Sequence, residues 1–198
     1  MKKLIIFGGN GFLGRALAQT AVSNNFQVTS ISRSGQPSPE EIWMTQVTWV
    51  KADVFQPETW QELLKEADAV INAIGILVEK KAKGITYERF NVQAAKIIAK
   101  AANHAGVKTL VYVSADPFTK LLSRYFHSKK SAEIVTRTYF PSALLIRPNF
   151  MYGKNRRGTI TQARLITLAK KIPILTSVFK GLQPQAVEKV AQQILAQL

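Results

Sequence analysis

The chain has 198 residues, of which 46% are hydrophobic, and it carries a formal net charge of +15. That length and apolar content suffice for one domain with a sizeable core. The sequence contains no cysteine, which excludes disulfides, thiolate catalysis and cysteine-based metal sites, and its two isolated histidines, His104 and His127, predict no metal cluster.

A hydrophobic strand followed by a glycine-rich turn begins the chain. Residues 2–7 predict a short buried strand, and the run Gly-Gly-Asn-Gly-Phe-Leu-Gly follows directly at 8–14. Apolar residues at helical spacing continue from Ala16 to Val22, so we expect the glycines to form a strand-to-helix turn. A strand this close to residue 1 predicts that the given residues hold no signal peptide.

The glycine spacing of that turn suits a dinucleotide pyrophosphate. Gly8 would permit the tight bend, Gly11 would let the backbone approach the phosphates, and Gly14 would let the helix pack close to the strand. Free N–H groups and the positive end of the helix dipole attract an anion to the same place. An ordinary glycine-rich turn is the alternative. The predicted cofactor residues here are Gly8, Asn10, Gly11, Phe12, Leu13 and Gly14.

Strand-like and helix-like segments alternate along the rest of the chain. Further buried strands are predicted at residues 26–32, 48–52, 69–73, 109–114 and 143–146. Helices are predicted at residues 57–66, 87–105, 122–138 and 184–198. Such alternation predicts an α/β fold of the Rossmann type, a doubly wound parallel sheet, as a single domain over residues 1–198.

The second predicted strand ends in Ser32, Arg33 and Ser34, which bear on the choice of cofactor. In this fold the following loop lies beside the adenosine ribose, and NAD sites place an acidic residue there. The Arg33 guanidinium instead suits a 2′-phosphate, with the two serines as hydroxyl donors. We therefore expect NADP(H) to be preferred over NAD(H); a solvated loop charge at Arg33 is the alternative. Further expected contacts, at the ends of the third and fourth strands, are Asp53, Val54, Ala73, Ile74 and Gly75.

Four further stretches carry a resemblance to a known family. They are Asn-Ala-Ile-Gly at 72–75, Tyr-Val-Ser-Ala at 112–115, Tyr-Phe-His-Ser-Lys at 125–129 and Arg-Pro-Asn-Phe-Met-Tyr-Gly at 147–153. With the glycine turn, they make residues 3–153 resemble the short-chain dehydrogenase/reductase superfamily in its extended or atypical branch. The sequence is most similar to the atypical group that contains the NAD(P)-binding accessory subunit of respiratory complex I and a ubiquinone-biosynthesis accessory protein. That resemblance implies NADPH binding and membership of a membrane-bound complex that makes or uses quinones.

The resemblance also implies a catalytic set. Tyr125 and Lys129 are four residues apart on a predicted helix and so share one face. In active members of the superfamily the tyrosine exchanges a proton with the substrate oxygen, while the lysine lowers the tyrosine pKa and holds the nicotinamide ribose. Ser114 would hydrogen-bond the same substrate oxygen. The alternatives are that Tyr125 packs beside Phe126, that Lys129 faces solvent, and that the Ser114 hydroxyl bonds the backbone.

Three other residues are expected near the cofactor. A strand that ends at Arg147 and Pro148 cannot continue its hydrogen-bond ladder and turns toward the cleft. The resemblance implies that this pair lies against the nicotinamide. Asn91, in the helix after the fourth strand, matches by position an asparagine that supports the catalytic region in the family. A plain polar contact inside the helix is the alternative for Asn91.

The C-terminal part of the chain is basic and short for a substrate lobe. The resemblance thins after Tyr152, and we expect residues 154–183 to form a much shortened lobe or a partner-binding segment within the single domain. Residues 134–187 contain nine Lys or Arg and no Asp or Glu. So uneven a charge predicts an anionic partner.

A basic amphipathic helix is predicted at residues 159–172, stopped by Pro173. Leu165, Leu168, Ala169 and Ile172 form its apolar stripe, and Arg164, Lys170 and Lys171 lie outside that stripe. Such a helix could lie on an anionic bilayer. The alternative is an ordinary substrate-lobe helix that buries the stripe in the core. The segment has no recognised nucleic-acid-binding motif, which argues against a specific nucleic-acid partner.

Three functions are compatible with these features. The first is an NADPH-dependent reductase of a hydrophobic carbonyl or quinone-related substrate. The second is a non-catalytic NADPH-binding accessory subunit of a membrane-associated complex, and the third is a basic nucleic-acid-binding regulator. The expected location is the cytoplasm or the periphery of the inner membrane, on the matrix side if a mitochondrial presequence has been removed.

Overall fold

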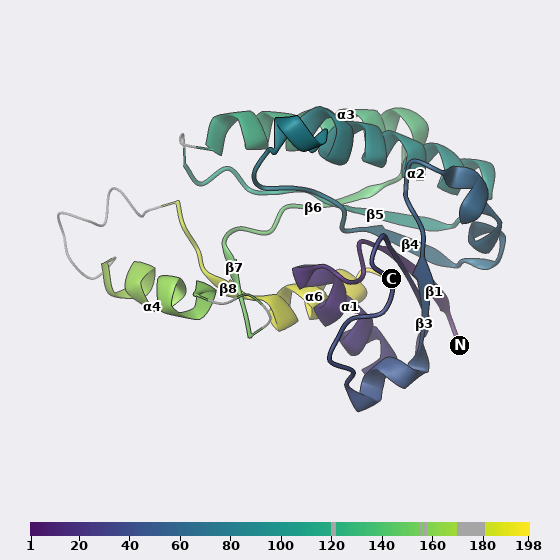
Figure 1. Ribbon diagram of the computed structural model, residues 1–198, viewed down its shortest axis with the longest axis horizontal. Coiled ribbons are helices and arrows are strands. Elements are labelled where there is room, and N and C mark those ends of the chain that lie inside the picture. Colours follow the sequence, from purple (N-terminus) through teal and green to yellow (C-terminus); the bar gives the residue numbers. More distant parts are fainter. Residues whose placement is uncertain (120–121, 155, 157, 170–180) are drawn as a thin grey trace.

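The fold is a parallel sheet with helices on both faces (Figure 1). A computed structural model describes residues 1–119, 122–154, 156, 158–169 and 181–198. Six strands pair in the order β3-β2-β1-β4-β5-β6, and every neighbouring pair is parallel. Their bounds are Lys3–Phe7 (β1), Gln27–Ser32 (β2), Val47–Lys51 (β3), Ala69–Asn72 (β4), Thr109–Val113 (β5) and Leu144–Ile146 (β6). The predicted Rossmann-type sheet is confirmed.

The side chains on the two faces of strand β1 belong to two separate parts of the core. Successive side chains of a strand point to opposite faces, so Leu4 and Ile6 belong to one hydrophobic cluster and Ile5 and Phe7 to the other. The first cluster is covered by the helices α1 (Phe12–Ser23) and α6 (Val187–Leu195), which pack against each other. The second is covered by α2 (Ala94–His104), with α3 (Ser123–Tyr139) packed beside it. Figure 1 shows the two layers on opposite sides of the sheet.

The helix predicted at residues 57–66 is two short 3-10 helices, Pro57–Thr59 and Gln61–Glu66, rather than one α-helix. Trp60 separates them with a backbone φ of −141°. Its indole is fully buried, with its ring centroid 4.7 Å from that of Phe7, and its Nε1 donates to the carbonyl of Asp53 at 3.1 Å. The burial of this large ring overrides the helical pattern because continuing the helix would move the indole out of its place.

The helix predicted at residues 87–105 has an irregular start. Glu88–Gln93 is π-helical, and the regular α-helix α2 begins only at Ala94. π-Turns are wider than α-turns and often occur at functional sites. This one contains Phe90 and Asn91, both of which are buried and both of which contribute to the site described below.

The C-terminal region contains a second, small sheet that the sequence did not predict. Strand β7 (Met151–Tyr152) pairs in parallel with β8 (Gln185–Ala186), which occupies the start of the predicted helix at 184–198. The Gln185 N–H donates to the carbonyl of Phe150 at 2.8 Å, and this bond draws the segment into a strand before α6 begins. No local sequence pattern indicates a pairing between residues so far apart.

The basic amphipathic helix is present as α4 (Thr159–Ala169), which extends away from the two helical layers in Figure 1. The remainder of its predicted length, with Lys170, Lys171, Ile172 and Pro173, lies outside the described residues. Leu165 and Leu168 are 60% and 58% exposed, so the alternative in which they enter the core is wrong. In the part of the chain that the structure describes, no helix combines the length and apolar character needed to cross a membrane.

Candidate nucleotide-binding site

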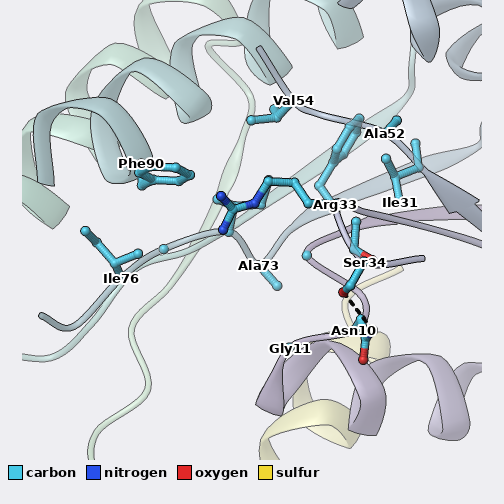
Figure 2. A pocket seen from close by; sticks show the side chains of 15 residues that line it. Asn10, Gly11, Ile31, Arg33, Ser34, Ala52, Val54, Ala73, Ile76 and Phe90 are labelled. Atoms are coloured by element: carbon cyan, nitrogen blue, oxygen red, sulfur yellow. Dashed lines mark hydrogen bonds between the residues drawn. The ribbon is translucent and has the colours of Figure 1, made fainter. Parts of the chain in front are cut away.

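A cavity of about 470 Å³ lies at the carboxyl ends of the strands, where the chain order reverses between β1 and β4. In open α/β sheets this is the place where ligands bind. Ten of the predicted cofactor residues line it: Gly8, Asn10, Gly11, Ser32, Arg33, Ser34, Val54, Ala73, Ile74 and Gly75. Phe7, Ile31, Ala52, Ile76 and Phe90 line it too, and the sequence analysis missed them. Figure 2 shows how these side chains surround the cavity.

The glycine turn has the backbone shape that its spacing predicted. Gly8 has a φ of +82°, which side-chain-bearing residues rarely adopt, and its carbonyl accepts from the Gly11 N–H at 2.9 Å. A Cβ on Gly14 would lie 2.6 Å from Gly9 Cα and would overlap the Gly8 carbonyl oxygen. Helix α1 starts after Gly11 without a side-chain cap and without an acidic residue in its first turn. Its positive end therefore suits the phosphates of a dinucleotide.

Asn10 joins the glycine turn to the loop after β2. Its Nδ2 donates to Ser34 Oγ at 2.9 Å, as Figure 2 shows, and to the Gly35 carbonyl at 3.0 Å. Arg15 in turn donates through Nε to Asn10 Oδ1 at 3.0 Å. The loop expected to hold the ribose end of the cofactor is thereby fixed relative to the loop expected to hold the pyrophosphate.

Arg33 lines the cavity, and its side chain is also exposed to solvent. Its guanidinium carbon is 4.9 Å from the centroid of the Phe90 ring, a cation–π geometry, and Figure 2 shows the side chain reaching toward that ring. A planar guanidinium and an aromatic ring are surfaces on which an adenine can stack. Phe90 escaped the sequence analysis because an aromatic residue at helical spacing has the pattern of a core residue.

Four predicted residues from the same region do not line this cavity. Leu13 and Gly14 are buried in the packing of α1. The guanidinium of Arg156 lies over the ring of Phe12, 5.8 Å from its centroid. Asp53 lies in a neighbouring shallow pocket with Arg33, and its Oδ1 accepts from the Phe55 N–H at 3.1 Å. These positions support the turn and the rim around the nucleotide cavity.

A second cavity of about 480 Å³ is lined by Leu77, the residue that directly follows Gly75 and Ile76 of the nucleotide cavity. Ser114, Tyr125 and Pro148 all line this second cavity, together with apolar side chains that include Phe118, Phe150 and Met151. Two of the three predicted catalytic side chains therefore share one hollow next to the cofactor cavity. Pro148 lies there as well.

Lys129, the third predicted catalytic residue, is buried behind Gly75. It is 4% exposed, and its Nζ donates to the Val113 carbonyl at 2.7 Å. A Cβ on Gly75 would lie only 3.2 Å from that Nζ. Burial lowers the pKa of Lys129 from 10.5 to about 7. The alternative in which this lysine faces solvent is wrong.

Tyr125 has a raised pKa, opposite to the lowering expected from a neighbouring lysine. Burial, reinforced by the nearby Tyr87, raises its pKa to about 12. The Tyr125 ring centroid lies 6.0 Å from that of Tyr87 and 5.2 Å from that of Phe126. Tyr125 therefore packs beside Phe126, as the alternative expected, and it also lines the second cavity.

Arg147 is engaged by Glu133 of helix α3. Its Nε and Nη2 each donate to one carboxylate oxygen at 2.7 Å, in the bidentate arrangement typical of strong pairs. Burial opposes ionisation of Glu133, but the hydrogen bonds from Arg147 prevail and lower its pKa to about 2. The Ser114 hydroxyl is buried and has no hydrogen-bond partner within the part of the chain that the structure describes. Among the described residues Arg147 lines neither cavity, and its guanidinium links the end of β6 to α3.

Asn91 connects the segment between the two cavities to helix α3. Its Oδ1 accepts from the Ile76 N–H at 2.9 Å, and its Nδ2 donates to Ser128 Oγ at 2.8 Å. Ser128 then donates to the carbonyl of Tyr125 at 2.7 Å. Asn91 therefore acts as a support of the site, and it is not among the residues that line the nucleotide cavity.

A glycine-rich strand-to-helix turn that opens on a cavity at the switch point of a parallel sheet defines a dinucleotide-binding Rossmann protein. A family model described as NAD(P)H-binding matches residues 8–165, and the chain belongs to that family. The residues fit such a nucleotide. Gly8 and Ala73 both line the cavity, and a Cβ at Gly8 would lie 3.1 Å from the Ala73 carbonyl carbon and fill part of the space between them.

Several characterised proteins are similar in sequence. MIOREX complex component 2 of Saccharomyces cerevisiae is 34% identical, over 79% of this chain and 75% of its own length. Ceramide reductase of Caulobacter vibrioides is 28% identical over 86% of this chain and 53% of its own length. Subunit 9 of the NADH dehydrogenase [ubiquinone] 1 alpha subcomplex, mitochondrial, of Arabidopsis thaliana is 28% identical over 98% of this chain and 49% of its own length. The predicted resemblance to the complex I accessory subunit is confirmed, although the chain spans only about half of the last two relatives.

Solved structures support the fold. MoeE5 in complex with UDP-glucuronic acid and NAD superposes with a TM-score of 0.73 at 17% identity, over 98% of this chain and 71% of that one. The UDP-glucuronic acid 4-epimerase from Bacillus cereus in complex with NAD gives 0.71 at 16% identity, over 98% and 72%. At such low identity these likenesses establish the fold.

Proposed function

We propose that this protein is an NADP(H)-dependent reductase of a hydrophobic carbonyl or quinone-related substrate. The observation that carries the proposal is that one short segment links two cavities. Gly75 and Ile76 line the nucleotide cavity, and the next residue, Leu77, lines the cavity of Ser114 and Tyr125. A substrate in the second cavity would lie next to the nicotinamide end of a cofactor in the first. The mostly apolar lining of the second cavity favours a hydrophobic substrate.

The preference for NADP(H) over NAD(H) rests on the loop after β2. Arg33 lies in the cavity, Ser34 Oγ is held by Asn10, and Ser32 Oγ donates to the Gly35 carbonyl at 3.1 Å. A guanidinium and hydroxyl groups are the donors that a 2′-phosphate requires. An acidic residue, which would favour the free ribose hydroxyls of NAD, is absent from Ser32 to Gly35.

The chain's own residues supply the protons and the orientation. NADPH, when bound, supplies the hydride for a carbonyl reduction. We assign the proton to Tyr125, whose pKa of about 12 keeps the phenol protonated and able to donate at neutral pH. Ser114 would orient the substrate oxygen in the same cavity. Lys129 lies behind Gly75, where its amine could meet the ribose.

A second function is favoured by the engagement of one predicted catalytic group elsewhere, because the Lys129 amine donates to the Val113 carbonyl. Such a site could hold NADPH without turning it over, as an accessory subunit of a membrane-associated complex. Two relatives are named as components of complexes, one of them mitochondrial, which supports a location at the matrix side of the inner membrane or, in a bacterium, the cytoplasm.

Replacement of Tyr125 by Phe separates the two functions. In a reductase, Tyr125→Phe should lower NADPH oxidation with hydrophobic aldehydes, ketones and quinones by about 100-fold or more and leave NADPH affinity unchanged. Tyr139→Phe, on the same helix, is the matched control and should keep full turnover. Equal turnover in Tyr125→Phe and the wild type would refute the catalytic assignment. If the wild type turns over none of these substrates, loss of complex assembly in Gly11→Val would favour the accessory subunit.

A further inference from the structure

Helix α4 presents an apolar surface that the described residues leave exposed. Leu165 and Leu168 are more than half exposed, and Ile160 is also exposed. At 100° per residue, Ile160, Arg164, Leu168 and Leu165 fall on one continuous side of the helix. We call these four residues the α4 face. Its composition is that of an interface, since large exposed apolar groups clustered beside a cation mark interaction sites.

The opposite side of α4 is anchored, which fixes the direction of the α4 face. Thr159 and Ala163 are both buried, and Thr159 Oγ1 donates to the Arg156 carbonyl at 2.7 Å. The helix also packs against β7. In Figure 1 it extends sideways from the sheet and its helical layers.

The charge around this helix selects the partner. Residues 134–187 contain no acidic residue, and Lys154, Arg156 and Arg164 are exposed on or near α4. A second copy of this chain would bring the same cations against one another in a two-fold contact, which is unfavourable. An anionic lipid surface matches both features, because it offers negative headgroups to the arginines and an acyl boundary to the leucines.

We propose that α4 docks this protein onto an anionic bilayer, with the α4 face entering the headgroup boundary. Docking would also place the second cavity near the membrane, because Arg156, Thr159 and Gln162 belong to α4 or its approach and line that cavity. A hydrophobic substrate could then pass from the bilayer into the cavity, a consequence that rests on the proposed function. The docking itself needs neither NADPH nor catalysis.

Sedimentation of the full chain with lipid vesicles tests the proposal. The protein should bind vesicles of phosphatidylcholine mixed with phosphatidylglycerol, should not bind phosphatidylcholine alone, and should dissociate in high salt. Replacing Leu165 and Leu168 together by Ser should lower the partition coefficient about tenfold or more, because two apolar side chains no longer enter the lipid. Arg164→Gln should lower it about fivefold.

The matched controls are Ile42→Ser and Ile134→Ser, which remove exposed apolar groups from other surfaces. Ile42 is 90% exposed and Ile134 is 63% exposed, and both variants should bind vesicles like the wild type. NADPH affinity, measured in parallel, should be unchanged in all of these variants, which separates membrane docking from nucleotide binding.

Three results would overturn the proposal. The first is a wild type that fails to bind anionic vesicles. The second is a Leu165 and Leu168 variant that binds them as well as the wild type does. The third is an Ile42 variant that loses as much binding as the Leu165 and Leu168 variant. A fourth contrary result is a wild-type dimer in light scattering that becomes a monomer in the Leu165 and Leu168 variant without any vesicle binding. That result would assign the α4 face to a second copy of the chain.

Discussion

Replacement of Lys129 by Met tests the energetic consequence of burying an amine in this fold. Met has a similar length and no charge, so the variant removes the ionisable group with little change in packing. Because burial lowers the Lys129 pKa from 10.5 to about 7, the unfolded chain binds more protons at this residue than the folded protein between those two pH values. Stability must therefore rise with pH across that window.

The size of the effect follows from the two pKa values. Each pH unit inside the window is worth up to about 1.4 kcal/mol, so the buried lysine costs roughly 4 kcal/mol at pH 7.5 and about 1 kcal/mol at pH 9.5. The variant also leaves the Val113 carbonyl without its donor, a loss of about 1–2 kcal/mol. Lys129→Met should thus be more stable than the wild type by about 2 kcal/mol at pH 7.5 and about equal to it at pH 9.5.

Urea unfolding of both proteins at several pH values between 7.5 and 9.5 measures this difference. Burial raises the pKa values of Tyr112 and Tyr125 above 10, so these two side chains do not titrate in that range. Lys130→Met, an exposed neighbour on α3, is the control and should keep the wild-type slope. A wild-type stability that does not change with pH, or an equal slope in Lys129→Met, would refute the reasoning.

Two further predictions concern the glycine turn and helix α3. Gly14→Ala should lower the free energy of unfolding by about 1–3 kcal/mol and weaken NADPH binding, because its Cβ would overlap backbone atoms of Gly8 and Gly9. Thermal unfolding measures the loss of stability, and nucleotide titration measures the loss of affinity. A variant with wild-type stability and wild-type affinity would contradict this prediction. Glu133→Gln should destabilise the protein by about 1–3 kcal/mol at pH 7 through loss of its bidentate pair with Arg147. Because the Glu133 pKa is lowered from 4.5 to about 2, this stabilisation is present above pH 4.5 and is lost as pH falls through about 2, so the acid unfolding followed by circular dichroism should be less steep in the variant. An unchanged acid transition would show that Glu133 contributes nothing there.

The sheet and the glycine turn were predictable because their signals are local. The strand β1 is hydrophobic on both faces, as a strand covered by two helical layers must be, and Leu4, Ile5, Ile6 and Phe7 are all buried. The turn that follows needs a positive φ at Gly8 and leaves no room for a Cβ at Gly14. Such requirements restrict the residue type at each position, so they are visible in the sequence.

The parts that were missed depend on contacts between distant residues. Strands β7 and β8 form because Phe150 and Gln185 meet, and Arg147 is engaged because Glu133 lies within reach on α3. The burial of Lys129 depends on the carbonyl of Val113, which no side-chain pattern reveals. Likewise, Phe90 enters the nucleotide cavity from a π-helical turn that has no marked sequence signature.

Calorimetric titration with NADPH and NADH tests the central claim of an NADP(H) site most directly. We expect NADPH to bind the wild type at least about tenfold more tightly than NADH, a gap of about 1.4 kcal/mol. The gap should collapse in Arg33→Ala and persist in Arg137→Ala, which removes an exposed arginine from α3. Binding of neither nucleotide by the wild type, or an NADPH preference that survives in Arg33→Ala, would contradict the account.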